Sequence, residues 1–277
     1  VIHDPSFLRE ALSYQIARKY MPASEANFAN LYINDTLWGI YSNVEAVNKD
    51  FLEKHYQSRS NSFFKCNPKN LDLFGENSNL NQYHGNDSSS YEDFYTLKSD
   101  NGWGKLYHLI DTLNNNPNSI NQILNVDRTL WMHAFNYALI NFDSYIGYAQ
   151  NYYLYKGLSE QFHPILWDLN MSFGGFRLTD ATQSYFNGFD ISQAQNMDPL
   201  NFINNSFLSP RPLITQLLTD PRNQKMYLAH MRTIIEEHFS NQNYATRAQD
   251  LQNLISSDVQ NDVNKFYSFN DFLNNIN

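Results

Sequence analysis

The sequence predicts an α+β fold with two lobes, a hairpin-containing N-terminal part and a largely helical C-terminal part. Three observations lead to this prediction: aromatic and β-branched runs around a turn near the N-terminus, an amphipathic helix over 128–142 that leads into a second hairpin, and helical periodicity from residue 213 onward. The chain has 277 residues, of which 42% are apolar, so it is long enough to bury a sizeable core.

The first part of the chain predicts one helix and one hairpin. Asp4 is a suitable N-cap and Pro5 a suitable first helical residue, so we expect a helix over about 5–20. Its apolar spacing indicates that it serves packing rather than chemistry. Two aromatic runs within 28–41 flank a turn-forming trio and predict an antiparallel hairpin.

The middle of the chain alternates helices, strands and one polar segment. Residues 67–90 are rich in Asn, Ser, Asp and Gly, which predicts a long surface loop. Asp127 is a suitable N-cap for the helix over 128–142, and we expect that helix to belong to the core. The other expected elements are helices over 49–56, 103–113 and 119–124, and strands over 62–65, 151–155 and 162–167.

The C-terminal part predicts helices. After Gly174 and Gly175 the sequence is irregular to about Pro212, and three apolar stripes at helical spacing then follow. We therefore expect a helical subdomain at this end of the chain. The stripes are formed by Leu213, Leu217 and Leu218, by Tyr227, Met231, Ile234, Ile235 and His238, and by Leu251, Leu254, Ile255 and Val259.

Composition limits the classes of function. A formal net charge of -9 disfavours nucleic acid and anionic membranes as partners, and no apolar run is long enough to predict a transmembrane segment. Charged residues make up only 17%, which is typical of a secreted or cell-surface protein, and the single Cys66 excludes an internal disulfide. Because Asp4 and Pro5 already resemble a helix start, we expect the natural protein to begin upstream of Val1, with any targeting segment outside this chain.

Carboxylate and amide side chains stand at the ends of predicted elements. Asp143 follows the helix over 128–142, Asn151 opens the next strand, and Asp168 follows the strand after it. The two outer ends of a hairpin lie together, so we expect these side chains to converge at one rim. Two carboxylates with an amide are typical of a site for a hard divalent cation such as Mg²⁺. Glycosidases also use a carboxylate pair, so a hydrolase is an alternative.

Histidines and tyrosines in these elements favour packing. Neither His133 nor His163 has a partner at the spacing of a metal site, so we expect both to be packing residues. Tyr152, Tyr153 and Tyr155 alternate along a strand, which predicts packing on both faces of a sheet.

The order of the motifs resembles the CotH family of spore-coat-type protein kinases. The resemblance extends over nearly the whole chain, and the combined order is more specific than any one motif. The segments that carry it are DPSFLR at 4–9, NLYIN at 30–34, GIY at 39–41 with Val44 and Glu45, NYYLY at 151–155, PILWDLNMSFG at 164–174, and RPL at 211–213 through Tyr227.

The resemblance implies a divergent, protein-kinase-like fold in a single domain over 1–277. Residues 1–100 would form part of an N-lobe and residues 101–277 a C-lobe, and the sheet region that family members carry before the first helix would lie outside this chain. The implied activity is that of a metal-dependent protein kinase. It would transfer the γ-phosphoryl group of ATP to serine or threonine hydroxyls of a partner protein, with Mg²⁺ or Mn²⁺ as the metal.

The resemblance also implies roles for five residues. Asp143 would orient the substrate hydroxyl or accept its proton, Asp168 would hold the metal ion, and Asn151 would be a second metal ligand. Lys65 would neutralise the phosphates of the nucleotide and would be oriented by Glu45.

Asn170 departs from the family pattern. Relatives often carry a second aspartate at this position, so here the candidate metal ligand is neutral, which lowers the negative charge available to a cation. This substitution favours, as an alternative, a catalytically inactive secreted binding or scaffold relative that keeps the fold.

Overall fold

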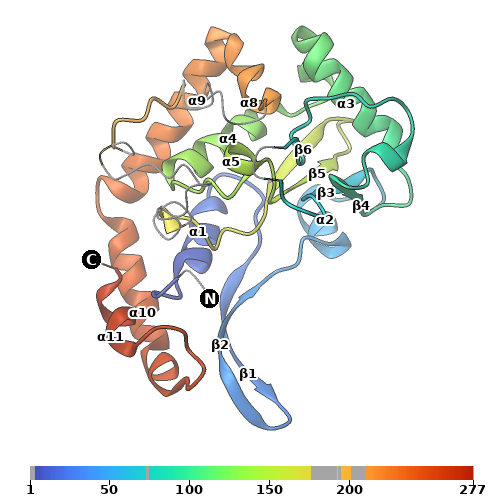
Figure 1. Ribbon diagram of the computed structural model, residues 1–277. Helices are drawn as coiled ribbons and strands as arrows, with labels where there is room; N and C mark the ends of the chain where they lie inside the picture. Colours follow the sequence, from blue (N-terminus) through green and yellow to red (C-terminus); the bar gives the residue numbers. More distant parts are fainter. Residues whose placement is uncertain (1–3, 73–74, 176–191, 193–194, 201–209, 277) are drawn as a thin grey trace.

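A computed structural model describes residues 4–72, 75–175, 192, 195–200 and 210–276, and in this part of the chain helices accompany two small sheets (Figure 1). The predicted α+β class is confirmed, and a kinase-like division into two lobes stays a prediction. The main elements are α1 (Arg9–Ala17), β1 (Ala26–Ile33), β2 (Thr36–Val44), α2 (Lys49–Tyr56), β3 (Phe63–Cys66), β4 (Tyr95–Leu97), α3 (Trp103–Asn115), α4 (Val126–Ala138), α5 (Tyr145–Tyr148), β5 (Tyr152–Lys156), β6 (Phe162–Leu166), α8 (Pro212–Thr215), α9 (Pro221–Ile234), α10 (Asn243–Asn261) and α11 (Phe269–Asn274).

Helix α1 begins later than the sequence predicts. Phe7 has a φ of 61°, which a right-handed helix does not allow, so the helix starts at Arg9 rather than at Pro5. Asp4 nevertheless acts as a cap, because its carboxylate accepts the backbone N–H groups of Ser6 and Arg9, each at 3.0 Å.

The predicted N-terminal hairpin is confirmed. Strands β1 and β2 pair antiparallel, and Asn34 and Asp35 join them with φ values of 48° and 60°, the two left-handed residues of a tight hairpin turn. Figure 1 shows this hairpin extending away from the rest of the molecule. The carboxylate of Asp262, at the end of α10, accepts the N–H of Ile40 at 3.1 Å and so anchors the hairpin to the C-terminal helices.

The larger sheet has the strand order β4-β3-β5-β6, with antiparallel pairing throughout. The predicted hairpin of β5 and β6 is confirmed, whereas the position of β3 between β4 and β5 was not predicted. Two strands of this sheet come from before residue 100 and two from after it. The larger sheet therefore contains strands from both sides of residue 100. The division into an N-lobe over 1–100 and a C-lobe over 101–277 stays a prediction.

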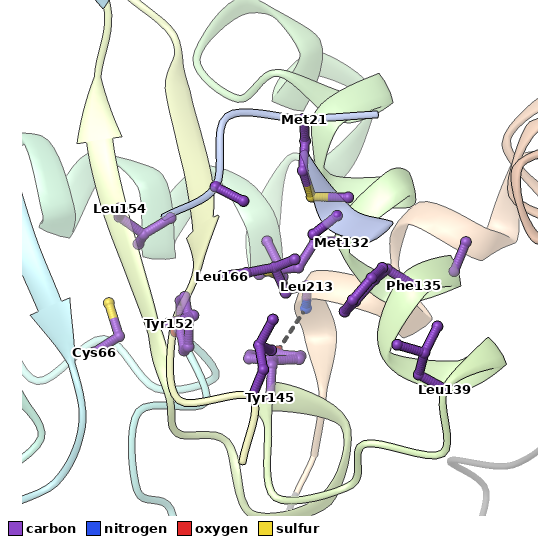
Figure 2. Close-up of a cluster of buried hydrophobic side chains, with 14 of the residues drawn as sticks. Met21, Cys66, Met132, Phe135, Leu139, Tyr145, Tyr152, Leu154, Leu166 and Leu213 are labelled. Carbon is purple, nitrogen blue, oxygen red and sulfur yellow. Dashed lines mark hydrogen bonds between the residues drawn. The ribbon is translucent and has the colours of Figure 1, made fainter. Parts of the chain in front are cut away.

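The larger sheet packs on both faces. Phe63, Tyr153 and Tyr155 pack against Phe51 and Leu52 of α2. Tyr152 belongs to the cluster on the other face, so the predicted packing of the tyrosines on both faces is confirmed. The opposite face belongs to the main core, where the sheet meets α4 and α8 (Figure 2). The residues labelled there are Met21, Cys66, Met132, Phe135, Leu139, Tyr145, Tyr152, Leu154, Leu166 and Leu213.

The polar segment 67–90 is not a simple surface loop. Ser78, Asn79 and Leu80 are buried, and the carbonyl oxygens of Ser78 and Asn79 accept the hydroxyls of Tyr152 at 2.5 Å and of Tyr145 at 2.8 Å. Composition indicated a loop correctly, but it could not indicate that buried tyrosines would hold its backbone in the core.

Helix α4 also differs from the prediction at both ends. Its N-cap is Asn125, whose side chain accepts the N–H of Arg128, rather than Asp127. It ends at Ala138 rather than at residue 142, because Ile140 has a φ of 48°.

The C-terminal part is helical, as predicted, and most residues of the predicted apolar stripes lie in the core, whereas Ile235 and Leu254 are exposed. Much of the irregular stretch between Gly175 and Pro212 lies outside the described residues. No described helix is both long enough and apolar enough to cross a membrane.

Candidate functional site

Asp143 stands in a turn that the end of α4 creates. After Ile140 reverses the chain, the backbone N–H of Asn141 returns to the carbonyl of Asn136 at 2.7 Å. The Ser144 hydroxyl then donates to the carbonyl of Asn141 at 2.6 Å. The Gln150 amide donates to Oδ1 of Asp143, so the carboxylate is held in one orientation.

Asn151 lies directly against the backbone of Asp143. Its Nδ2 donates to the carbonyl oxygen of Asp143 at 2.9 Å, which leaves the amide oxygen as the end that a metal ion would take. The chain between the two residues forms the single turn α5, and Ala149 and Asn151, with φ of 53° and 59°, direct it back into β5. The segment between Asp143 and Asn151 therefore folds back on itself, so that the two residues lie within hydrogen-bond distance of each other.

Asp168 stands at the same edge of the sheet, in a strained turn. Tyr152 pairs with Leu166, so the residues just outside this pair lie at one end of the hairpin: Asn151 before β5, and Trp167 and Asp168 after β6. The φ of Asp168 is 55°, a conformation that aspartate tolerates better than most residues. Its backbone N–H donates to Oη of Tyr14 at 3.1 Å.

Backbone hydrogen bonds join the Asp143 turn to the chain after Asp168. The N–H of Phe173 donates to the carbonyl of Leu139 at 2.6 Å, and that of Gly174 to the carbonyl of Ile140 at 3.3 Å. A hydrogen bond therefore joins Asp143 directly to Asn151. Asp168 is connected to them only through the backbone bonds between the neighbouring loops. A shared cleft around all three stays a prediction.

Lys65 is the cation beside Asp168. It lies on β3, opposite Tyr153 of β5, and its Nζ is 5.8 Å from the centroid of the Trp167 ring. Burial raises the pKa of the Asp168 carboxyl, and the Lys65 ammonium and the N–H of Asn170 oppose this rise. Lys65 therefore stabilises the charged form of Asp168, and its role in binding a nucleotide stays a prediction.

Glu45 has different partners from those expected. Its carboxylate contacts Lys54 Nζ at 3.1 Å and accepts the N–H of Glu25 at 3.0 Å. Because Lys54 of α2 is within reach of this carboxylate, Glu45 fastens the base of the hairpin to α2. The prediction that Glu45 orients Lys65 is not supported by these contacts.

Helix α1 contributes two polar residues that sequence reasoning did not assign to the site. Tyr14 is fully buried, and its hydroxyl holds Asp168 as described. Glu10 lies one turn earlier, and its pKa is raised to about 7 by burial first, then by the charges of Asp168 and Asp4. The expectation that this helix serves packing rather than chemistry stays a prediction, although α1 also contacts the Asp168 turn through Tyr14. The signal was a Glu and a Tyr four residues apart on an apolar helix.

The oxygen atoms at this edge fit a divalent cation. Asn170 lies two positions after Asp168, and its Oδ1 is buried and has no hydrogen-bond partner. Together with the Asp168 carboxylate it provides the hard oxygen ligands that Mg²⁺ and Mn²⁺ take. Within the described ranges no group of three or more His, Cys, Asp or Glu residues is placed to bind a metal, so amides and phosphates would have to complete the shell.

The two histidines are packing residues, as predicted. His133 is fully buried with a ring nitrogen 3.2 Å from the carbonyl of Leu213, and burial lowers its pKa to about 3. Burial and the charge of Arg128 lower the pKa of His163 to about 4. Both rings are therefore neutral at pH 7 and do not contribute charge to the site.

One comparison with known proteins identifies a family. The family model described as CotH kinase protein matches residues 1–277, the whole chain. No curated protein matches the chain closely enough to count as a relative.

Proposed function

Because the chain belongs to the CotH kinase protein family, we propose that it is a metal-dependent protein kinase that transfers the γ-phosphoryl group of ATP to serine or threonine hydroxyls of a partner protein. The family supports a kinase-like function. The observation that supports the finer proposal is the charge interaction of Lys65 with Asp168, whose loop is hydrogen-bonded to the residues just before the Asp143 turn.

Each residue has a physical task in this proposal. Lys65 neutralises charge on the nucleotide phosphates, and its position over Trp167 restricts where the ammonium can lie. Asp143, held by Gln150, accepts the proton of the attacking hydroxyl or orients that hydroxyl. Asn151 fixes the Asp143 turn through its Nδ2 and offers its oxygen to the metal.

Asp168 and Asn170 would hold the metal ion. A bound Mg²⁺ or Mn²⁺ would neutralise charge on the transferring phosphoryl group. The partial burial of Asp168 suits this task, because a desolvated carboxylate interacts more strongly with a cation than an exposed one does. Lys65 beside this carboxylate also favours phosphoryl transfer over the alternative of a two-carboxylate hydrolase.

Replacement of Asp168 tests the proposal. Asp168→Asn is a cleaner variant than alanine, because asparagine tolerates the φ of 55°. We expect phosphoryl transfer from labelled ATP to a serine-rich protein to fall by at least about 10²–10³. The folded state raises the pKa of Asp168, so its ionised form lowers the stability of the metal-free protein at neutral pH. The melting temperature of the variant should therefore stay equal or rise.

Asp35→Asn is the matched control. Asp35 has nearly the same backbone conformation, with a φ of 60°, but it lies in the exposed hairpin turn. This control should keep wild-type activity. Activity of Asp168→Asn equal to that of the wild type would show that Asp168 is structural and that the kinase proposal is wrong for this site.

An inactive binding relative is the second candidate. Asn170 favours it, because this position supplies no negative charge, and the described residues offer no group of three acidic or other metal-binding side chains. A wild-type chain that neither transfers phosphate nor changes its melting temperature with ATP and Mn²⁺ would support this candidate.

A further inference from the structure

The carboxyl group of Glu10 has no structural task that the fold explains. The nearby Asp4 carboxylate is fully used, since it accepts the hydroxyl of Ser6 and the N–H groups at the start of α1. In contrast, among the residues that the structure describes, neither a cation nor a hydrogen-bond donor contributes to the pKa of Glu10. A half-buried acid near two other acids lowers stability unless something compensates its charge.

The position of Glu10 is set by Tyr14. The two residues are four apart on α1 and therefore lie on the same face of the helix. The Tyr14 hydroxyl accepts the N–H of Asp168 at 3.1 Å, so this face of α1 is directed at the Asp168 turn. The charge of Asp168 also raises the pKa of Glu10, which agrees with this placement of Glu10 on the face of α1 that meets the Asp168 turn.

A third oxygen points to a ligand at the same place. Oδ1 of Asn170 is buried without a partner two residues after Asp168, and the backbone N–H of Asn170 lowers the pKa of the Asp168 carboxyl. Two carboxylates and one amide oxygen form a donor set that suits a hard divalent cation and would leave room for water or phosphate oxygens. Glu10 would supply the negative charge that Asn170 lacks.

We propose that Glu10 is the second acidic metal ligand of this site and binds Mg²⁺ or Mn²⁺ together with Asp168 and the side-chain oxygen of Asn170. Lys65, on β3 and near the Trp167 ring, would then bind phosphate rather than metal. This inference rests on the metal site of the proposed kinase function, but the binding of metal alone tests it without any phosphoryl transfer.

Mn²⁺ binding to the full chain without nucleotide provides the test, measured from the paramagnetic resonance signal of free Mn²⁺. Glu10→Gln keeps the size of the side chain and removes its charge, and we expect it to weaken Mn²⁺ binding at least about tenfold. Glu53→Gln, on the exposed side of α2, is the matched control and should bind Mn²⁺ as the wild type does. Melting curves would show that both variants are folded.

A double variant shows whether Glu10 binds the metal ion or only supports the structure around it. In Glu10→Gln with Asn170→Asp, the lost carboxylate is restored on the other side of the cation, so we expect Mn²⁺ affinity to return to within about threefold of the wild type. A purely structural role of Glu10 would not allow this rescue.

The outcomes distinguish this inference from the kinase proposal. Equal Mn²⁺ affinity of the wild type and Glu10→Gln, or no Mn²⁺ binding by the wild type, overturns the role of Glu10 even if phosphoryl transfer is observed. Binding that depends on Glu10 in a wild type that transfers no phosphate supports the role of Glu10 and removes the kinase proposal.

Discussion

Replacing Tyr14 with phenylalanine removes one hydroxyl and tests how Asp168 is held. Tyr14 is fully buried on α1, and its hydroxyl accepts the backbone N–H of Asp168 at 3.1 Å. Phenylalanine fills the same space without the oxygen, so the variant leaves that N–H without its partner. The perturbation is therefore confined to one hydrogen bond at a left-handed residue with a φ of 55°.

The size of the effect follows from this single bond. A buried N–H group that loses its acceptor costs about 1–3 kcal/mol. In domains of 150–250 residues, each kcal/mol lowers the melting temperature by about 2–4 °C, so we expect a decrease of several degrees. Asp168 also loses the contact that fixes its turn, and loss of such a supporting partner typically lowers metal affinity or activity about 10–100-fold.

Tyr95→Phe provides a matched control. The Tyr95 hydroxyl accepts the N–H of Leu80 at 2.9 Å, and Leu80 is also left-handed, with a φ of 60°. Both variants should lose similar stability, measured by thermal and urea unfolding, but only Tyr14→Phe should weaken Mn²⁺ binding and phosphoryl transfer. Equal Mn²⁺ affinity in the two variants would refute the argument that α1 positions Asp168, and unchanged stability of Tyr14→Phe would refute the hydrogen-bond argument itself.

Two further predictions concern the neighbouring elements. A Cβ atom at Gly147 would lie 1.9 Å from the carbonyl oxygen of Phe142, so Gly147→Ala should lower the free energy of unfolding by about 3 kcal/mol. Gly104→Ala, where a Cβ meets nothing within 4 Å, should be neutral or stabilising in the same urea titration, and equal stability of the two would contradict the steric argument. Lys65→Met should weaken nucleotide binding in calorimetry. It should also move the acidic limb of the activity profile to higher pH, because the Lys65 ammonium lowers the pKa of Asp168; an unmoved limb would separate Lys65 from Asp168.

The sequence predicted elements whose signals are local. Helix α2 has the predicted bounds, and the hairpin turn at Asn34 and Asp35 follows from residues that tolerate left-handed backbone. Helix α4 was predicted to extend too far because apolar spacing continues beyond Ile140, where the backbone leaves the helix. The position of β3 between β4 and β5 depends on the pairing of distant segments, which periodicity does not encode.

The site prediction relied on the ends of elements. Asp143, Asn151 and Asp168 were chosen because each follows or opens an element, and the structure joins the loops that carry them, while their roles stay predictions. Glu10 and Tyr14 were not assigned to the site because their helix has an apolar pattern, and only the hydrogen bond between Tyr14 and Asp168 shows that α1 contacts the Asp168 turn. Secretion, the protein substrate and the contribution of any upstream sheet stay predictions.

Hydrogen bonds between separate segments hold the backbone of this site in place. Five non-glycine residues in or beside the two turns have positive φ angles: Ile140, Ala149, Asn151, Asp168 and Phe173. Such conformations cost of order 1–3 kcal/mol each and persist only when the surroundings hold them. Three hydrogen bonds hold them here. The Phe173 N–H donates to the carbonyl of Leu139, the Asn151 amide donates to the carbonyl of Asp143, and the Asp168 N–H donates to the Tyr14 hydroxyl. Since each turn is held by a group from another segment, loosening one contact should shift the others, and the site should respond to these substitutions as a unit.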